Sequence, residues 1–234
     1  YLYYRLTNFV QNHRDIANSY SKDMLAGKPI TDIKKQRSMY EDCYPRAFVD
    51  DIEHINNLLV PCGLLPSTIL NDTIVSLNST EFEETNIALS IDLERNFKET
   101  NVLFSNSSNW LEDSGIFPHN THNEHFIVWM RTSAFTPFRK LYGISKKNIP
   151  AGNITFDIVN RYDTNMFNGE KWIVISEKTD FGSNRAGPAI VFAIMTIMFG
   201  LASLGLALIG WSRAKPTSPF HPANIKNSFN ESNQ

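Results

Sequence analysis

An uninterrupted apolar segment near the C-terminus, Ala186 to Ser212, constrains this chain more than any other feature. It contains no charged residue. A helix rises about 1.5 Å per residue, so a segment of this length outspans the roughly 30 Å hydrocarbon core of a bilayer. Trp211 lies at its end, where indole rings favour the membrane interface. The segment is therefore predicted to be a transmembrane helix. The alternative is a buried helix of a soluble protein, which seldom runs this long without a charge.

Flanking charges predict how this helix is oriented. Asp180 and Arg185 precede it, whereas Arg213 and Lys215 follow it. Because basic residues concentrate on the cytoplasmic side, the C-terminal tail is expected to be cytoplasmic. The predicted organisation is a luminal or extracellular domain at 1–185, a transmembrane helix at 186–212 and a cytoplasmic tail at 213–234.

Asn-x-Ser/Thr sequons support the same orientation. Such sequons are acceptors for N-linked glycans in luminal domains, and several precede the helix, where a luminal domain would carry glycans. The predicted glycosylation sites are Asn71, Asn78, Asn106 and Asn153.

Composition limits the class of partner and the redox chemistry. The formal net charge is −2 and no basic stripe appears, so nucleic acid is not an expected partner. The two cysteines, Cys43 and Cys62, lie in the predicted luminal part, where an oxidising compartment favours a disulfide. Closing that loop would stabilise the fold by about 3 kcal/mol in the chain-entropy model. Two unpaired buried thiols are the alternative.

Periodicity predicts one helix in the first part of the chain. Tyr1 to Arg5 is aromatic and strand-like. Apolar residues then recur at helical spacing from Leu6 to Tyr20, with Thr7 available as N-cap, which predicts an amphipathic helix of about four turns with His13 on its buried face. Gly27 ends it. The segment to Leu59 is expected to be loop with short helical pieces.

Alternating β-branched and aromatic residues predict strands later in the chain. They occupy residues 125–132, 153–162 and 171–178. Asn168-Gly169 between the last two is a hairpin-turn signal. Residues 71–123 are polar and expected to form long loops with occasional strands. The predicted class is α+β, a mainly antiparallel β luminal domain with an amphipathic helix, followed by a transmembrane helix.

No N-terminal signal peptide or earlier membrane span precedes this domain, and Tyr1 is not an initiator methionine. The sequence is therefore expected to be a fragment that lacks an upstream segment.

Several motifs resemble one protein family. Residues 3–14 read YYRLTNFVQNHR, which is similar to the signature of the cell division control protein 50 family, also called the ligand-effect modulator family. Residues 61–64 (PCGL), 125–132 (HFIVWMRT) and 138–143 (FRKLYG) resemble further family segments and follow in the same order. The resemblance covers most of residues 1–211.

The resemblance implies a non-catalytic subunit that forms a heterodimer with a type IV P-type ATPase, a pump that flips phospholipids. Such subunits carry a glycosylated, disulfide-bonded luminal domain, accompany the pump from the endoplasmic reticulum and support its cycle. The pair Cys43 and Cys62 resembles the family's later disulfide. The implied location is the endoplasmic reticulum, Golgi, endosome or plasma membrane, in contact with membrane lipids and without a cofactor.

Small residues recur along the predicted transmembrane helix in steps of three and four, which places them on one face. In lipid, helices associate where small side chains let backbones approach closely. This seam is expected to pack against another membrane helix, although small residues are also common in membrane helices generally. Its members are Ala186, Ala189, Ala193, Thr196, Gly200, Ser203, Ala207 and Gly210.

Two other functional classes remain as alternatives. The spacing of His119, His122 and His125 could indicate a metal-dependent luminal enzyme, although the His-Glu-x-x-His order is absent. Glycosylation and β content would also suit an adhesion or receptor ectodomain. Under the subunit hypothesis, aromatic and Arg side chains are candidate partner contacts. These are Trp129, Arg131, Phe138 and Arg139.

Overall fold

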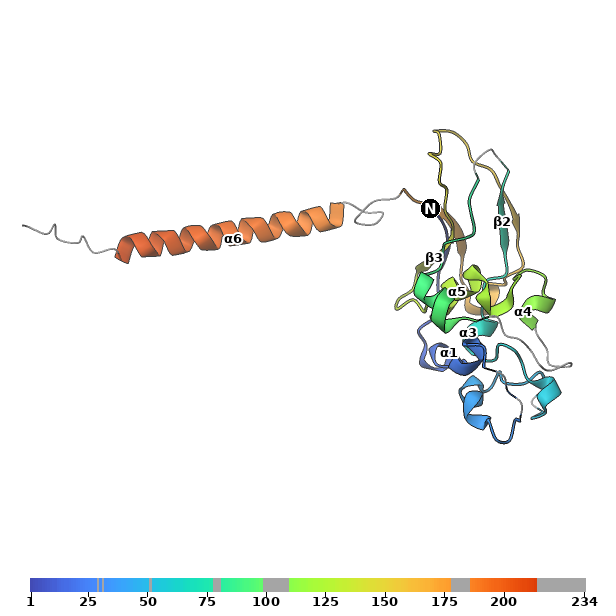
Figure 1. Ribbon diagram of the computed structural model, residues 1–234. Helices are drawn as coiled ribbons and strands as arrows, with labels where there is room; N and C mark the ends of the chain where they lie inside the picture. The colour runs from blue at the N-terminus through green and yellow to red at the C-terminus, as the bar shows by residue number, and fades with distance from the viewer. Residues whose placement is uncertain are drawn as a thin grey trace, which may run out of the picture. The chain divides into compact units, whose positions relative to one another are not determined.

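The computed structural model describes residues 1–28, 30, 32–50, 52–77, 81–98, 110–177 and 186–213. The chain divides into two compact units, Tyr1–Glu177 and Lys178–Gln234. The first unit combines antiparallel strands with short helices, and the second contains helix α6 (Ala186–Arg213) (Figure 1). The predicted combination of helices and antiparallel sheet with one apolar C-terminal helix is confirmed.

A three-stranded antiparallel sheet has the N-terminal strand at its centre. Strand β1 (Leu2–Leu6) lies between β3 (Phe138–Gly143) and β5 (Lys171–Ile175). Alternate residues of β1 are buried, which fits the two-residue period of a strand with one face on the core. On its other face the guanidinium of Arg139 lies 5.0 Å from the centre of the Tyr3 ring. The N-terminal strand of the unit therefore pairs with its C-terminal strand.

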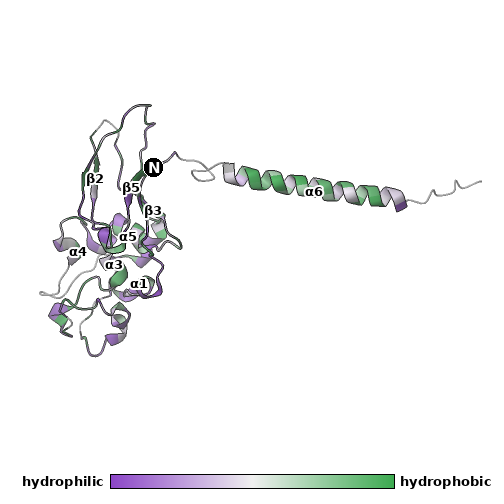
Figure 2. Ribbon diagram, turned by 180° about the vertical axis from the view of Figure 1, so that it is seen from behind, coloured by the Kyte–Doolittle hydropathy of each residue, from purple (hydrophilic) through white to green (hydrophobic). Residues whose placement is uncertain are grey.

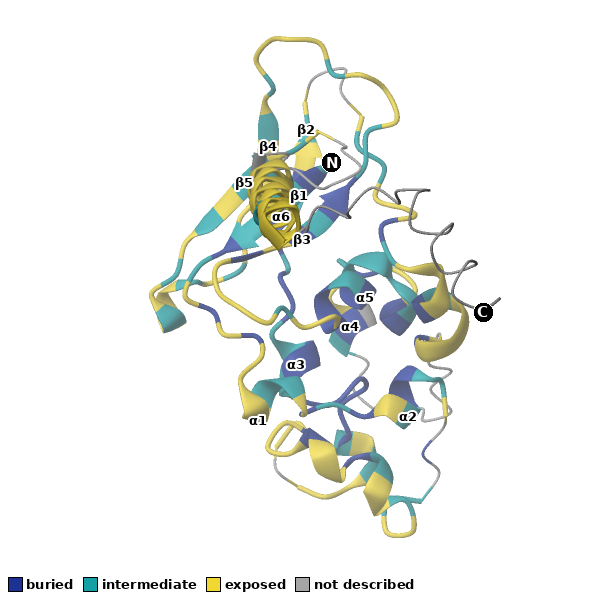
Figure 3. Cartoon of the chain, turned by 90° about the vertical axis from the view of Figure 1, so that its left-hand side faces the viewer, coloured by how far each residue is buried: buried dark blue, intermediate teal, exposed yellow. Residues whose placement is uncertain are grey.

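A second, two-stranded sheet pairs β2 (Thr73–Ser76) with β4 (Phe156–Val159) in antiparallel register. One hydrogen bond from it reaches β3 of the first sheet, because the Ile74 N–H donates to the hydroxyl of Tyr142 over 3.0 Å. Lys171 on β5 forms an ion pair with Asp72, which directly precedes β2. Figure 3 shows strands of both sheets at one end of the unit and the short helices at the other.

The predicted hairpin between the last two strands is wrong, although both strands exist. Strand β4 pairs with β2, and β5 pairs with β1. The Asn168-Gly169 turn instead ends the 3-10 helix η6 (Asn165–Phe167), with Asn168 left-handed at φ 50°. A Cβ on Gly169 would lie 2.5 Å from the Thr7 carbonyl oxygen, so this glycine permits a close approach of two segments.

The predicted four-turn helix from Leu6 to Tyr20 is also wrong. Strand β1 extends through Leu6, and a left-handed Asn8 (φ 58°) turns the chain before α1 (Arg14–Ala17) and α2 (Lys22–Leu25). His13 is the N-cap of α1 and its side chain is 60% exposed, not buried. The apolar spacing was misleading because the buried residues of this segment belong to a strand end and a turn, and they do not lie on one face of a helix.

Residues 125–132, predicted as a strand, form helix α5 (Glu124–Met130). The Asn123 side chain caps it, accepting hydrogen bonds from the backbone of His125 and Phe126. Buried side chains at positions 126, 127, 129 and 130 have helical spacing. Tertiary burial and the cap override the β preference of the individual residues.

The remaining elements are short helical turns. They are η1 (Arg37–Met39), η2 (Glu41–Cys43), η3 (Ile55–Asn57), α3 (Leu64–Ser67), the π-helical η4 (Asp92–Asn96), α4 (Trp110–Asp113) and η5 (Asn120–His122). The first three confirm the expected loop with short helical pieces up to Leu59.

Two hydrophobic clusters form the core of the first unit. The larger one surrounds the fully buried Phe126, Ile127 and Trp129 of α5 and takes in the inner face of β1. The smaller one surrounds Cys43 and Cys62.

Helix α6 is drawn mostly in green with white turns between, the colours of hydrophobic and intermediate residues (Figure 2). From Gly187 to Arg213 it is long and apolar enough to cross a membrane, and its apolar side chains are exposed to solvent in the isolated chain. Such a surface is suited to lipid. The helix begins at Ala186 and ends one residue beyond Ser212. The division into a luminal domain, a transmembrane helix and a cytoplasmic tail stays a prediction. Residues 214–234 lie outside the described part.

Candidate partner-binding surfaces

A buried glutamine joins the segment after β1 to the far half of the unit. Gln11 is 1% exposed. Its amide nitrogen donates to the Trp129 carbonyl over 2.8 Å, and its amide oxygen accepts from the Ser133 N–H over 3.0 Å. The Trp129 indole in turn donates to the carbonyl of Leu65. Residues far apart in sequence therefore share one satisfied hydrogen-bond network.

A buried lysine holds the C-terminal end of α5. The Lys140 ammonium lies 3.4 Å from the carbonyl oxygens of Val128 and Trp129 and also contacts that of Arg131. A cation at this position satisfies carbonyls that have no partner within the helix. Burial lowers the pKa of Lys140 to about 8. Together, Gln11, Trp129 and Lys140 form a structural hub.

The four candidate contact residues therefore separate into two kinds. Trp129 and Phe138 belong to the core, with 0% and 6% exposure, so neither side chain presents a surface to a partner. Arg131 and Arg139 are exposed. The sequence could not distinguish them, because a composition argument does not report burial.

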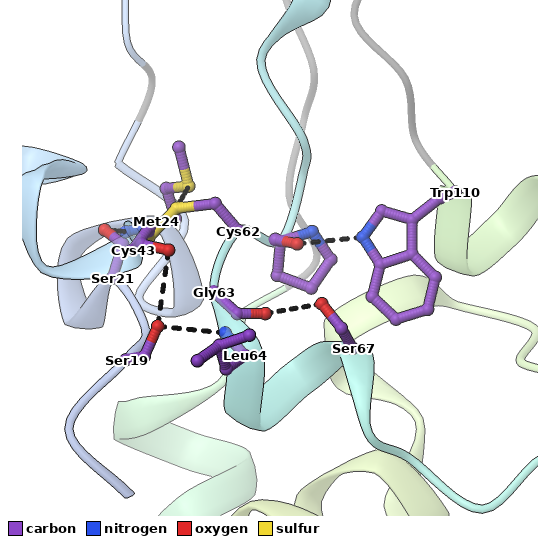
Figure 4. The surroundings of a disulfide bond; sticks show 10 residues. Ser19, Ser21, Met24, Cys43, Cys62, Gly63, Leu64, Ser67 and Trp110 are labelled. Carbon is purple, nitrogen blue, oxygen red and sulfur yellow. Dashed lines mark hydrogen bonds between the residues drawn. A yellow bond between two sulfur atoms is a disulfide. The ribbon is translucent and has the colours of Figure 1, made fainter. Parts of the chain in front are cut away.

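The disulfide joins Cys43 to Cys62, the pair expected from the sequence, and both residues are buried (Figure 4). Around it, the Ser19 hydroxyl donates to the Cys43 carbonyl and accepts from the Leu64 N–H. Gly63 has φ +115°, and a Cβ there would lie 2.1 Å from the Ser19 carbonyl oxygen. The glycine of the Pro-Cys-Gly-Leu segment therefore allows its backbone to pack closely against the backbone of Ser19.

The seam of α6 is open along its length. Thr196 and Ser203 direct their hydroxyls to the backbone carbonyls of Phe192 and Gly200, over 2.8 Å each. Side chains added at Gly200 or Gly210 would meet no atom within 4 Å in this chain. The seam therefore presents small residues with satisfied hydroxyls, which is the surface that membrane helices use for close packing.

Residues 1–216 match the model of the LEM3 (ligand-effect modulator 3) family / CDC50 family. This chain belongs to the CDC50/LEM3 family. Cell cycle control protein 50C of Mus musculus is 30% identical, over 89% of this chain and 66% of that protein. ALA-interacting subunit 3 of Arabidopsis thaliana is 31% identical over 78% of this chain and 51% of that protein. Cell cycle control protein 50A of Bos taurus is 29% identical over 89% of this chain and 63% of that protein. The chain spans about half to two thirds of the length of these relatives.

The CDC50/LEM3 motifs found in the sequence coincide with the structural hub and the disulfide. Residues 3–14 supply β1 and Gln11, residues 61–64 carry Cys62 and Gly63, residues 125–132 form most of α5, and residues 138–143 are β3. Each of these segments contributes buried residues to the unit Tyr1–Glu177.

In this CDC50/LEM3 chain, the three histidines of the predicted cluster have separate surroundings. His122 bonds through Nδ1 to the Phe97 carbonyl at 2.9 Å, and His125 lies 2.9 Å from Glu84. His119 is left-handed at φ 65° ahead of η5. No group of three potential metal ligands occurs in the described part of the chain.

Two of the predicted glycosylation sites can be placed. Asn153 is exposed before β4, and Asn71 is half-buried before β2. The Arg161 guanidinium donates to the Asn71 carbonyl and to the Thr73 hydroxyl of the same sequon. Asn78 and Asn106 lie outside the described residues. Their glycosylation, like that of Asn71 and Asn153, stays a prediction.

Proposed function

We propose that this chain is a non-catalytic accessory subunit of a type IV P-type ATPase, and that it supports phospholipid translocation by the pump. Membership of the CDC50/LEM3 family carries the proposal. Plant relatives are named ALA-interacting subunits, a name that states partnership with another protein. The proposed role includes stabilising the pump and accompanying it out of the endoplasmic reticulum.

The proposed role of the chain is to bind the pump. The motif residues are used for internal packing, and the described histidines are engaged separately. A partner can shift a pump's cycle only by binding its conformations with different affinities. In the proposed arrangement, the unit Tyr1–Glu177 is luminal or extracellular and contacts the pump's loops, while α6 packs against a membrane helix of the pump. The proposed residence is the endoplasmic reticulum, Golgi, endosome or plasma membrane.

Affinity purification tests this proposal directly. The tagged natural protein, extracted in mild detergent, should recover a type IV P-type ATPase at near-equal stoichiometry, identified by mass spectrometry. Reproducible recovery of folded protein without such an ATPase would contradict the proposal.

The seam provides a sharper test of how the complex forms. Gly200→Leu with Gly210→Leu adds bulk to the seam, so the affinity for the pump should fall by about thirtyfold if each substitution costs about 1 kcal/mol of helix packing, and recovery should fall with it. Ala202→Leu with Gly205→Leu is the matched control. Helical periodicity places these two small residues on the opposite face. Equal recovery with both double variants would exclude the seam as the contact.

A further inference from the structure

A cavity of about 450 Å³ lies between α2, η4 and the end of α5. Its apolar lining includes Leu25, Phe97 and Met130, all of which are buried. Its charged lining comes from three separate elements: Lys22 and Asp23 on α2, Asp92 and Arg95 on η4, and Arg131 at the end of α5. The proposed function uses none of these groups.

One cation of this cavity is held in place by a buried acid. The Arg131 Nε lies 2.5 Å from Asp92 Oδ2, and the amide of Asn96 donates to the other oxygen of Asp92 over 2.8 Å. The Asp92 side chain is 4% exposed, and its bonds to Arg131 and Asn96 outweigh burial and lower its pKa. Within the described residues Nε is the guanidinium nitrogen that bonds to Asp92, and the two terminal nitrogens form no hydrogen bond, so they can bind another group.

The other two cations are exposed. Among the described residues, the side chains of Lys22 and Arg95 form no hydrogen bond or ion pair, whereas Asp23 pairs with Lys28 at 2.7 Å. Both acids of the cavity are therefore already paired, and the lining carries one excess positive charge. That excess becomes two when Lys28, the partner of Asp23, is included.

We propose that this cavity binds a phosphoryl group. A phosphate monoester carries a charge of about −1.5 to −2 at pH 7 and three acceptor oxygens, which three cations from three elements can meet together. Arginine held in a fixed orientation is well suited to this chemistry. A carboxylate offers only two oxygens and one charge. The π-helical turn of η4 places Asp92 and Arg95 on the same cavity, and such turns are frequent at functional sites.

Direct binding tests the site without any pump. The full chain in dodecyl maltoside is titrated with inorganic phosphate at constant ionic strength, and the unfolding temperature is recorded. We expect a saturable rise. Lys22→Gln with Arg95→Gln should weaken binding by about tenfold or more, as expected for the loss of charge-assisted hydrogen bonds. Both side chains are exposed, so the folded structure should be unaffected.

Lys34→Gln with Lys147→Gln is the matched control, because it removes the same charge at exposed residues that do not line the cavity. The control should bind phosphate like the unmodified chain. A rise that does not saturate, or one that the two double variants change equally, would overturn the proposal.

A second titration distinguishes the source of the phosphoryl group. Dihexanoyl phosphatidic acid, whose headgroup is a phosphate monoester, is used below its micelle concentration. Binding tighter than that of inorganic phosphate, and weakened by Lys22→Gln with Arg95→Gln, would assign the site to a lipid headgroup whose chains contact the apolar lining. Equal affinities would assign it to the phosphate group alone. Failure of both ligands to bind would overturn this site while leaving the purification test of the pump complex unaffected.

Discussion

At the scale of single residues, the side chains that matter most are polar groups inside the core. Gln11, Lys140 and Asp72 are each at most 8% exposed, and each bonds to a group on a different segment of the chain. A buried polar group is favourable only when it is satisfied. Such residues therefore determine which segments of the chain contact each other. The surrounding aliphatic side chains favour burial of these segments but do not select the partner segment.

Gln11→Leu tests this role. The substitution keeps the volume approximately but removes one of the two donors to the Trp129 carbonyl and the Gln11 acceptor of the Ser133 N–H, which should lower the free energy of unfolding by about 1–3 kcal/mol. Urea denaturation followed by tryptophan fluorescence measures it. Asn12→Ala, at an exposed neighbour, should change stability by less than about 0.5 kcal/mol. Equal effects at the two positions would contradict the role assigned to Gln11.

Buried tyrosines should make the unit sensitive to alkaline pH. Burial raises the pKa of Tyr4 well above its model-peptide value of 10.0, and that of Tyr142 to about 12. Above pH 10 the unfolded chain loses these protons while the folded chain keeps them, so the free energy of unfolding falls as pH rises. The lowered pKa of Lys140 acts in the opposite direction between about pH 8 and 10.5.

Tyr4→Phe isolates one of these contributions. It preserves the ring and removes the titrating hydroxyl, so the loss of stability between pH 10 and 12 should be shallower than in the unmodified chain. Lys140 and Tyr142 are present in both proteins and cancel in the difference. Urea midpoints measured across this range provide the check, and identical slopes would show that Tyr4 ionises freely in the folded state.

At the scale of elements, capping and tertiary burial decide whether a segment with ambiguous local sequence forms a helix or a strand. Helix α5 has only 7 residues, below the length at which an isolated helix is stable. It depends on the Asn123 cap at its start, on Lys140 at its end and on burial of one face.

Asn123→Ala removes the cap from α5. The loss should cost about 1 kcal/mol of the free energy of unfolding, because two backbone N–H groups lose their acceptor. Asn123→Asp retains an acceptor and should recover most of the stability. Thermal unfolding of the unmodified chain and the two variants measures this difference. Equal destabilisation by both substitutions would show that Asn123 does not act as a cap.

At the scale of the whole unit, two small sheets are connected by a few polar contacts. The Lys171 ammonium on β5 lies 2.5 Å from Asp72 Oδ2 and 2.7 Å from the Tyr162 carbonyl. Asp72 also accepts from the backbone of Arg161 and Tyr162. A two-stranded sheet is marginally stable by itself, so the β2–β4 pair depends on these contacts.

Lys171→Met should therefore destabilise the unit by about 3 kcal/mol, because it leaves a buried carboxylate without its counter-charge. Hydrogen exchange should show the loss first in β2 and β4. Asp72→Asn combined with Lys171→Met should cost less than the two single changes added together. Strict additivity would show that the two side chains do not act as a pair.

Helix α6 could be predicted from sequence alone. Its 28 residues need only their own composition, because a continuous apolar run of this length favours a helix that could cross a membrane. The family was equally accessible, since its motifs are local strings of residues. The existence of β4 and β5 also followed from local alternation.

Only the tertiary structure decided which strands pair, that residues 6–20 do not form one helix and that residues 124–130 do. It also decided that Trp129 and Phe138 are core while Arg131 joins Asp92 at the rim of a cavity. These outcomes depend on contacts between segments often more than 100 residues apart, such as β1 with β3 and β5. Local periodicity cannot report such contacts, because the burial of each side chain is set by partners that the local sequence does not contain.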